Sequence, residues 1–149
     1  MFTYFNPRRS DLFASAFAMQ VAWIEKGLQK ELTHGNLDSV RTIIDVRDAM
    51  RAYWLAIIHG RPGEAYNIGT PKPEVSMIDL VKTLQTISKR EVTYNLIEYP
   101  ASYPADEPMR RCPDIQKARL QLNFNPIVSL DDGLRRFLDW SNTAFTGEP

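Results

Sequence analysis

Two arginines, Arg41 and Arg111, are the residues whose type and position best suit a charged ligand. Arg41 starts a predicted strand directly after a polar turn, and Arg111 lies in a proline-rich stretch. A guanidinium stays protonated and donates paired hydrogen bonds, so each arginine could bind the oxygens of a diphosphate. The alternative for Arg41 is a surface ion pair with Asp38 or Asp45, and the residues alone favour that alternative.

Several other kinds of site are excluded by the absence of the motifs that they need. The seven glycines form neither G-x-G-x-x-G nor a P-loop, so a glycine-rich phosphate cradle is not expected. No G-x-S-x-G elbow and no H-E-x-x-H helix occur. None of the six tyrosines is followed by a lysine four residues later, so a Tyr/Lys proton-transfer pair on one helix face is also missing.

Cysteine and histidine are too sparse for a disulfide or a common zinc site. Cys112 is the single cysteine, and the two histidines stand apart from it and from each other. His59 ends a predicted helix, where a cation suits the negative end of the helix dipole. The neighbouring Arg111 would favour the thiolate form of Cys112, but a lone cysteine is usually inert, and we assign it no role. No metal site is expected.

Length and composition indicate one globular domain over residues 1–149. The chain has 149 residues, of which 44 % are hydrophobic and 24 % are charged. Eighteen basic residues balance eighteen acidic ones, which argues against a nucleic-acid partner. No apolar run approaches the ~20 residues of a membrane helix, and the first residues lack the features of a signal peptide. We therefore expect a cytoplasmic protein without a membrane segment.

Hydrophobic periodicity predicts short strands that alternate with helices. The expected fold is α/β with about five helices, and its few small elements cannot make a full doubly wound sheet. The predicted helices are 11–26, 48–58, 77–88, 114–122 and 130–140, and the predicted strands are 32–34, 41–46, 64–68 and 92–97.

Capping residues set the expected starts of three helices. Ser10 is the predicted N-cap of the first helix, and Asp48 that of the second. Ser76, with Asp79 three residues later, resembles a capping box and predicts the start of the third. Tyr53 and Trp54 share the second helix with other apolar residues and are predicted to pack against the core.

Four segments in order along the chain resemble the C-terminal half of extended short-chain dehydrogenases that act on nucleotide sugars. The first three are residues 7–20, residues 35–54 with Gly-Asn-Leu followed by Arg41, and P-G-E-A-Y-N-I-G at 62–69. These are most similar to the GDP-mannose 4,6-dehydratases and the related GDP-6-deoxy-mannose reductases. The fourth, residues 106–126, is more similar to the UDP-glucuronate decarboxylases. The resemblance covers almost the whole chain.

The resemblance implies the small substrate-binding lobe of such an enzyme, without the complete Rossmann sheet. In complete members a Rossmann half binds NAD(P) and carries the Ser/Thr, Tyr and Lys that perform the chemistry. We therefore expect no cofactor on this chain, a nucleotide-diphosphate sugar as ligand, the missing Rossmann half as partner, a monomer and no turnover. The alternatives are a stand-alone nucleotide-sugar-binding module and a protein-interaction module without catalysis.

The resemblance also assigns candidate substrate-binding residues. Arg41 and Arg111 match the positions that contact the diphosphate, while Arg110 is expected to be a surface neighbour. His34 falls where relatives place an apolar or aromatic residue beside the nucleobase, although a strand histidine with no role is equally consistent with the sequence. Asn36 belongs to the Gly-Asn-Leu motif and completes the expected binding set. No catalytic residue is expected on this chain.

Overall fold

The computed structural model describes residues 12–97 and 108–144, which form five helices and five short strands. The predicted α/β class with about five helices is confirmed. No helix within these residues is long and apolar enough to cross a membrane. The helices are α1 (Phe13–Lys26), α2 (Val46–His59), α3 (Met77–Ile87), α4 (Gln116–Leu122) and α5 (Leu130–Ala144). The strands are β1 (Leu32–His34), β2 (Val40–Arg41), β3 (Val75–Ser76), β4 (Tyr94–Leu96) and β5 (Arg110–Arg111).

The strands form two small sheets within the described residues. In one, β1 and β4 are parallel, with Leu32 opposite Tyr94. In the other, the order is β3-β2-β5, with β2 antiparallel to β3 and parallel to β5. The β2–β5 pair joins segments about seventy residues apart and places Arg41 opposite Arg111.

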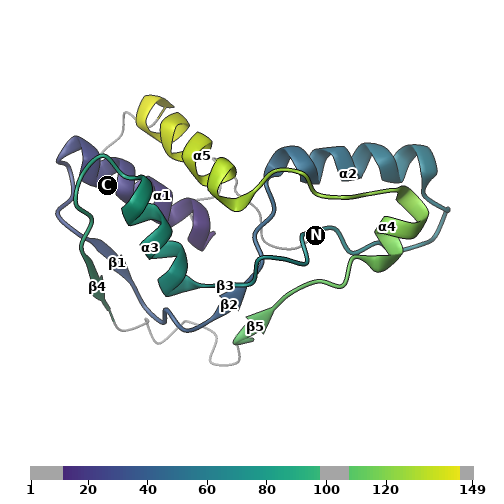
Figure 1. The fold of residues 1–149 in the computed structure, drawn as a ribbon, viewed down its shortest axis with the longest axis horizontal. Coiled ribbons are helices and arrows are strands. Elements are labelled where there is room, and N and C mark those ends of the chain that lie inside the picture. Colours follow the sequence, from purple (N-terminus) through teal and green to yellow (C-terminus); the bar gives the residue numbers. More distant parts are fainter. Residues whose placement is uncertain (1–11, 98–107, 145–149) are drawn as a thin grey trace.

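The main body is a helical layer packed on these sheets. α1 contacts α3, α5 and β1, and Figure 1 shows the three helices gathered at one end of the molecule. Ala14, Ala18 and Ala22 are fully buried at four-residue steps on α1, so neighbouring elements can approach the helix closely. Phe17 fills the centre of this core. Gly27, with a φ of 76°, ends α1 in the left-handed conformation that glycine adopts without strain.

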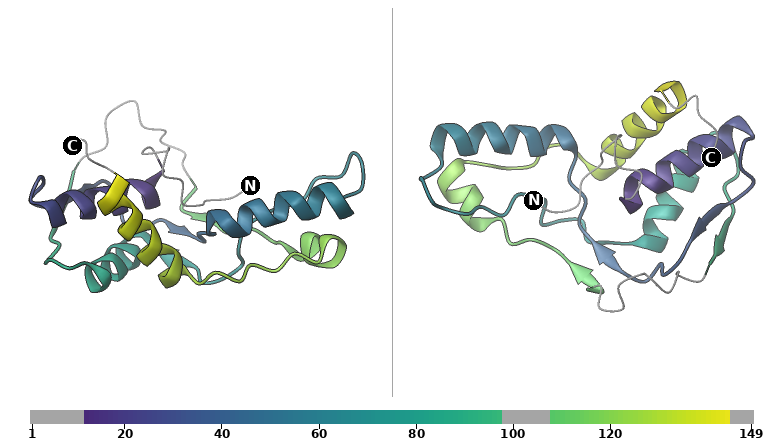
Figure 2. Two further views of the ribbon diagram at one scale, coloured as in Figure 1. Left: turned by 90° about the horizontal axis from the view of Figure 1, so that it is seen from above. Right: turned by 180° about the vertical axis from the view of Figure 1, so that it is seen from behind.

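A thinner part of the molecule contains α2 and α4, which we call the arm. It extends away from the main body (Figures 1 and 2). α2 packs on α4, and the arm has its own small hydrophobic core. The buried members of this core are Ile44, Ala52, Ile68, Ile115, Ala118, Leu122 and Phe124.

Three predicted strands are shorter than the sequence pattern suggests or are missing. The strand predicted at 41–46 is β2, which covers only Val40–Arg41, and the strand predicted at 92–97 is β4, which covers Tyr94–Leu96. Residues 64–68 form no strand in the described structure, although their sequence is strand-like. A strand is defined by a hydrogen-bonded neighbour, and none of the other strands lies beside this segment.

The predicted N-cap of α2 is wrong by three residues. Asp45, not Asp48, is the cap: it has an extended backbone, and its carboxylate accepts a hydrogen bond from the Arg47 amide. Burial works to raise the pKa of Asp45, but the Arg47 side chain and amide hold that pKa below its ordinary value. Asp48 is instead a buried residue in the first turn of the helix.

Of the other two predicted N-caps, Ser76 is confirmed and Ser10 is not described by the structure. Ser76 caps α3 as predicted, since its hydroxyl accepts from the Asp79 amide and donates to the Asp79 carboxylate. α1 begins at Phe13, with Leu12 at the cap position and no side-chain hydrogen bond there. The predicted cap Ser10, like the first part of the resemblance segment 7–20, lies outside the described residues.

The predicted packing of Tyr53 and Trp54 is wrong. Tyr53 is 45 % exposed and Trp54 is 66 % exposed on the outer side of α2. The small residues Ala49 and Ala52 make the buried side instead. Apolar residues occur on both the buried and the exposed side of α2, so the sequence alone could not show which side faces the core.

Glu25 joins three helices and should make the stability of the body sensitive to acid. Its carboxylate accepts hydrogen bonds from the Ser88 hydroxyl and the Lys89 amide after α3, and from the Asn142 amide on α5. Partial burial works to raise the pKa of Glu25, but these hydrogen bonds together hold it below its ordinary value. A carboxylate with a lowered pKa in the folded state contributes stability above its unfolded pKa and loses it as the pH falls.

We therefore expect Glu25→Gln to flatten the acid dependence of stability. The free energy of unfolding of the unmodified chain should fall between about pH 5 and pH 3, and the variant should lose less over the same range. Urea denaturation at each pH measures both. Glu91→Gln, at an exposed position, is the matched control, and equal acid sensitivity of Glu25→Gln and this control would contradict the assignment.

Candidate functional site

Arg41 and Arg111 lie side by side on neighbouring strands. Their Cα atoms are register partners in the parallel pair of β2 and β5. Successive side chains of a strand alternate between the two faces of a sheet, so directly paired residues start from the same face. The fold thus brings two distant arginines together at one place on a three-stranded sheet.

The Arg41 side chain is buried and bonded to the backbone of both strands. Its exposed fraction is 2 %, and one guanidinium nitrogen donates to the Val40 carbonyl at 2.8 Å and to the Met109 carbonyl at 3.2 Å. The Val40 amide also donates to the Met109 carbonyl. Arg41 therefore fixes the position of β5 against β2 as well as supplying a positive charge.

Arg110 and Arg111 are both exposed but have different surroundings. Arg110 forms a two-pronged ion pair with Glu74, with nitrogen–oxygen distances of 2.8 and 2.7 Å. Because neighbouring residues of a strand alternate in direction, Arg111 starts from the opposite face, the one it shares with Arg41. The prediction that Arg110 is a surface neighbour agrees with this ion pair, while Arg111 makes no hydrogen bond or ion pair with the described residues.

Asn36 shapes the turn between β1 and β2. Its side-chain oxygen accepts from the Asp38 amide at 2.7 Å, which is the geometry of an Asx turn. Its amide nitrogen lies 3.6 Å from the Met109 sulfur. Met109 thus contacts both Asn36 and Arg41, so the turn, β2 and the start of β5 meet at one point.

His34 lies at the end of β1, against the core. Its ring meets the Phe17 ring edge-on, with centroids 4.5 Å apart at an angle of 90°. The histidine is half-buried, and its backbone carbonyl accepts from the Ile97 amide. One side of the His34 ring therefore packs β1 against α1. The predicted contact with a nucleobase remains a prediction.

Cys112 does not have the thiolate character that its position beside Arg111 suggested. Partial burial and the nearby Glu74 carboxylate raise the pKa of the Cys112 thiol, and these effects outweigh the positive charges of Arg110 and Arg41. The Glu74 carboxylate, which is paired with Arg110, lies close enough to Cys112 for its negative charge to disfavour a second negative charge on the thiol.

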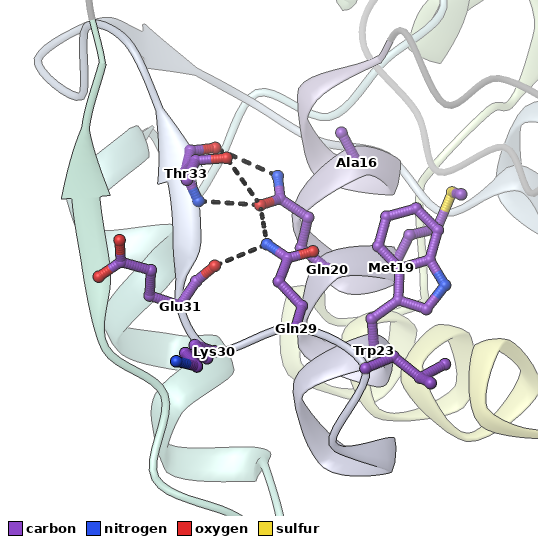
Figure 3. A pocket seen from close by; sticks show the side chains of 9 residues that line it. Ala16, Met19, Gln20, Trp23, Gln29, Lys30, Glu31 and Thr33 are labelled. Atoms are coloured by element: carbon purple, nitrogen blue, oxygen red, sulfur yellow. Dashed lines mark hydrogen bonds between the residues drawn. The ribbon is translucent and has the colours of Figure 1, made fainter. Parts of the chain in front are cut away.

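A separate cavity of about 570 Å³ opens between α1 and β1 (Figure 3). Gln20 dominates one wall: its amide pairs with both the amide and the carbonyl of Thr33, and it also accepts from Gln29. Gln20 thereby occupies the free edge of β1 as a neighbouring strand would. None of the four predicted binding residues lines this cavity.

Sequence reasoning missed Met109 and Gln20. Met109 acts largely through its backbone carbonyl, which no side-chain pattern reveals. Gln20 is a polar residue on a helix and gives no signal until β1 is placed beside it. Within residues 12–97 and 108–144, no cluster of His, Cys, Asp and Glu could hold a metal ion.

Comparison with known proteins gives the family. The model of the family described as GDP-mannose 4,6 dehydratase matches residues 1–137. The chain is 28 % identical over 144 residues to GDP-6-deoxy-D-mannose reductase of Pseudomonas aeruginosa, covering 95 % of this chain and 46 % of that protein. It is 32 % identical over 119 residues to dTDP-glucose 4,6-dehydratase 1 of Escherichia coli, covering 75 % of this chain and 32 % of that protein.

Solved structures show the same fold. The reductase RMD from Pseudomonas aeruginosa, complexed with NADPH, superposes with a TM-score of 0.83 at 22 % identity. UDP-glucuronic acid 4-epimerase from Bacillus cereus, in complex with UDP-glucuronic acid and NAD, superposes with a TM-score of 0.81 at 30 % identity. The matches cover 95 % and 97 % of this chain but 46 % and 44 % of those chains.

The chain thus spans less than half the length of these relatives, and the matched part includes both sheets and the paired arginines. It belongs to the GDP-mannose 4,6-dehydratase family, within the NAD-dependent epimerase/dehydratase group of extended short-chain dehydrogenases.

Proposed function

We propose that this chain is the nucleotide-sugar-binding portion of a dehydratase or epimerase similar to GDP-mannose 4,6-dehydratase, and that it is inactive by itself. The observation that carries the proposal is the register of Arg41 with Arg111 on β2 and β5. Two arginine side chains that start from paired positions of neighbouring strands offer the fixed positive charge that a diphosphate requires. The relatives' complexes with UDP-glucuronic acid and other nucleotide sugars support the same ligand class.

Asn36 and His34 complete the proposed site: Asn36 contacts Met109, and His34 lies two residues earlier, at the end of β1. The amide of Asn36 is exposed on the turn, where a polar ligand group can reach it. His34 presents a half-buried ring beside Phe17, and a planar base could pack on such a surface. In this arrangement the arginines bind the diphosphate, Asn36 orients the ligand and His34 contacts the base.

We expect no NAD(P) site on the described residues. A dinucleotide site places the pyrophosphate on free amides of a helix N-terminus that follows a glycine-rich turn. Here the N-terminus of α2 is occupied by the Asp45 carboxylate and that of α3 by the Ser76 hydroxyl. The hydride chemistry that relatives draw from NAD(P) would therefore have to come from outside these residues.

Calorimetric titration of the chain tests the proposed function. GDP-mannose, UDP-glucuronic acid and dTDP-glucose are the ligands, and NADH and NADPH are the controls. At least one nucleotide sugar should bind saturably while neither dinucleotide does, and no turnover of the bound sugar should follow. Saturable binding of a dinucleotide, or of no nucleotide sugar at millimolar concentration, would contradict the proposal.

The second candidate is a protein-interaction module without catalysis. The large apolar side chains exposed on α2 favour this function, since soluble proteins rarely leave such residues together on a surface. The two candidates are compatible, because the arm that contains α2 and the sheet that contains the arginines are separate parts of the fold.

A further inference from the structure

The two outer edges of the sheet of β1 and β4 differ in how their backbone groups are bound. On the edge of β1, the Gln20 side chain pairs with the amide and the carbonyl of Thr33 (Figure 3). The Gln29 side chain donates to the Glu31 carbonyl, the preceding outward group of the same edge. Two side-chain amides therefore close the edge of β1 as a third strand would.

The outer edge of β4 is open. The hydrogen bonds between β4 and β1 use the carbonyl of Thr93 and the amide of Ile97, and alternate residues of a strand direct their backbone groups to opposite sides. The amides and carbonyls of Tyr94 and Leu96 therefore point away from β1. None of these four backbone groups makes a hydrogen bond with the described residues.

The open edge has defined limits. At its start, Gln85 of α3 donates to the Val92 carbonyl at 2.6 Å and so occupies the preceding outward position. At its end, β4 stops at Leu96. The open edge thus consists of two outward residues, Tyr94 and Leu96, with Asn95 between them.

β4 also lacks the features that normally keep an edge strand from pairing. Residues 92–97 contain no charged residue, proline or glycine. Tyr94 is 42 % exposed, Leu96 is 60 % exposed and Ile97 is 50 % exposed. Tyr94 and Leu96 start from the same face of the sheet as the fully buried Leu32, so the layer that covers β1 leaves β4 uncovered.

We propose that two copies of this chain associate through their β4 strands, which pair antiparallel about a two-fold axis at Asn95 and join the two small sheets into one. In this register Tyr94 of each copy lies opposite Leu96 of the other, and each such pair exchanges both of its backbone hydrogen bonds. Every open group of the edge is thereby bound. The two aromatic–aliphatic pairs also lie side by side on one face, where cross-strand pairs of this kind are stabilising.

A second copy fits this edge because the edge is complementary to itself. A two-fold contact joins the same surface of both copies, and the open groups of Tyr94 and Leu96 are matched by those of the same two residues. A longer foreign strand would meet the position that Gln85 already occupies. The surface lies on a different sheet from Arg41 and Arg111, so the inference goes beyond the proposed function.

The small size of the contact makes the dimer weak. A stable interface buries about 800 Å² on each partner, far more than three partly exposed side chains supply. We expect a Kd on the order of 0.1 mM. At low concentration the chain is then the monomer that the resemblance implies.

Sedimentation velocity of the full 149-residue chain tests the association. The weight-average sedimentation coefficient should rise between about 10 µM and 1 mM. Leu96→Pro removes one outward amide and spares the bonds to β1, and Leu96→Lys places a charge on the edge. Each should weaken association about tenfold or more. Leu120→Lys is the matched control, at a position that is 78 % exposed on α4, and should leave association unchanged.

Cysteine crosslinking tests the register. Asn95 lies opposite its own counterpart at a position without hydrogen bonds, where Cα atoms are about 4.5 Å apart and a disulfide can form. In a Cys112→Ser background, which removes the single native thiol, Asn95→Cys should give a disulfide-linked dimer under mild oxidation. Thr93→Cys, also at an exposed position, should not, because its two copies lie about 13 Å apart along the paired strands.

Two results would overturn the proposal. One is a sedimentation coefficient that stays constant up to about 1 mM. The other is equal crosslinking from positions 93 and 95, which would show random collision in place of a fixed register. The thermal midpoint of each variant shows whether it folds. If Leu96→Pro does not fold, Leu96→Lys and the two cysteine variants still decide the outcome.

Discussion

Replacing Asp48 with alanine is expected to lower the free energy of unfolding by about 3 kcal/mol or more. The Asp48 side chain is only 2 % exposed, and one carboxylate oxygen accepts from the amides of Ile127 and Val128, both at 2.8 Å. The other oxygen lies 3.1 Å from the Arg51 guanidinium. Alanine removes the carboxylate and with it all three interactions. Each hydrogen bond to a buried charge contributes about 1.5–3 kcal/mol.

The position of Asp48 explains why the loss should be large. Its two amide partners belong to the chain between α4 and α5, so the carboxylate ties the arm to the segment that returns to the main body. Arg51 also donates to the Asn125 carbonyl in that segment. Removing Asp48 therefore leaves Arg51 without its carboxylate and two amides without an acceptor.

Urea denaturation measures the effect, with two controls. Asp48→Asn keeps one acceptor oxygen at the same place and should cost less than Asp48→Ala. Asp139→Ala removes an exposed carboxylate on α5 and should change the free energy of unfolding by less than about 0.5 kcal/mol. If Asp48→Ala is no more destabilising than Asp139→Ala, the carboxylate does not hold the arm.

Asp48 also shows where sequence reasoning reaches its limit. The sequence correctly predicted a helix here and an aspartate at its start, but Asp45 and Asp48 are equally suited to an N-cap and lie three residues apart. The choice depends on where β2 ends, which in turn depends on pairing with β3 and β5. Such pairing joins distant segments and leaves no local signal.

The predicted strand at 64–68 failed for a related reason. Its residue pattern is that of a strand, but a strand needs a neighbour to pair with, and the described chain provides none. Tyr53 and Trp54 are similar: their apolar character predicts burial, but both are exposed on the outer side of α2. By contrast, Ser76 acts through a contact within three residues, and it was predicted correctly as the N-cap of α3.

The candidate site could be predicted only in part. The polar turn at Asn36 and the exposed position of Arg111 follow from local sequence. The burial of Arg41 does not, because it arises from the Met109 carbonyl, which is 68 residues away. That Arg41 and Arg111 are neighbours was expected from family resemblance, and the register of β2 and β5 gives it a structural basis.

Arg111→Ala is expected to weaken nucleotide-sugar binding at least tenfold. A guanidinium that contacts a diphosphate contributes about 1.5–3 kcal/mol in charge-assisted hydrogen bonds, and about 1.4 kcal/mol corresponds to a factor of ten in Kd. Arg111 is exposed and makes no bond to the described residues, so its removal should leave the free energy of unfolding unchanged. Binding is measured by calorimetric titration with the nucleotide sugar that binds the unmodified chain.

Arg110→Ala is the matched control, because it removes the same charge one residue away. Its guanidinium is held by Glu74 on the other face of β5, so its loss should change Kd by less than threefold. Equal weakening by the two variants would mean that only the net charge of the chain matters. Repeating the titrations at high ionic strength distinguishes a direct contact from the effect of net charge, because salt screens exposed charges that attract a ligand over a distance.

Arg41 requires a different substitution, because alanine would also remove the hydrogen bond to the Met109 carbonyl that holds β5 against β2. Arg41→Lys keeps the positive charge but cannot reproduce the planar fork that reaches the Val40 and Met109 carbonyls. If Arg41 and Arg111 bind one diphosphate, the loss from Arg41→Lys should be smaller in the Arg111→Ala background than in the unmodified chain. Strictly additive losses would show that the two arginines act independently, and the shared diphosphate site would then be wrong.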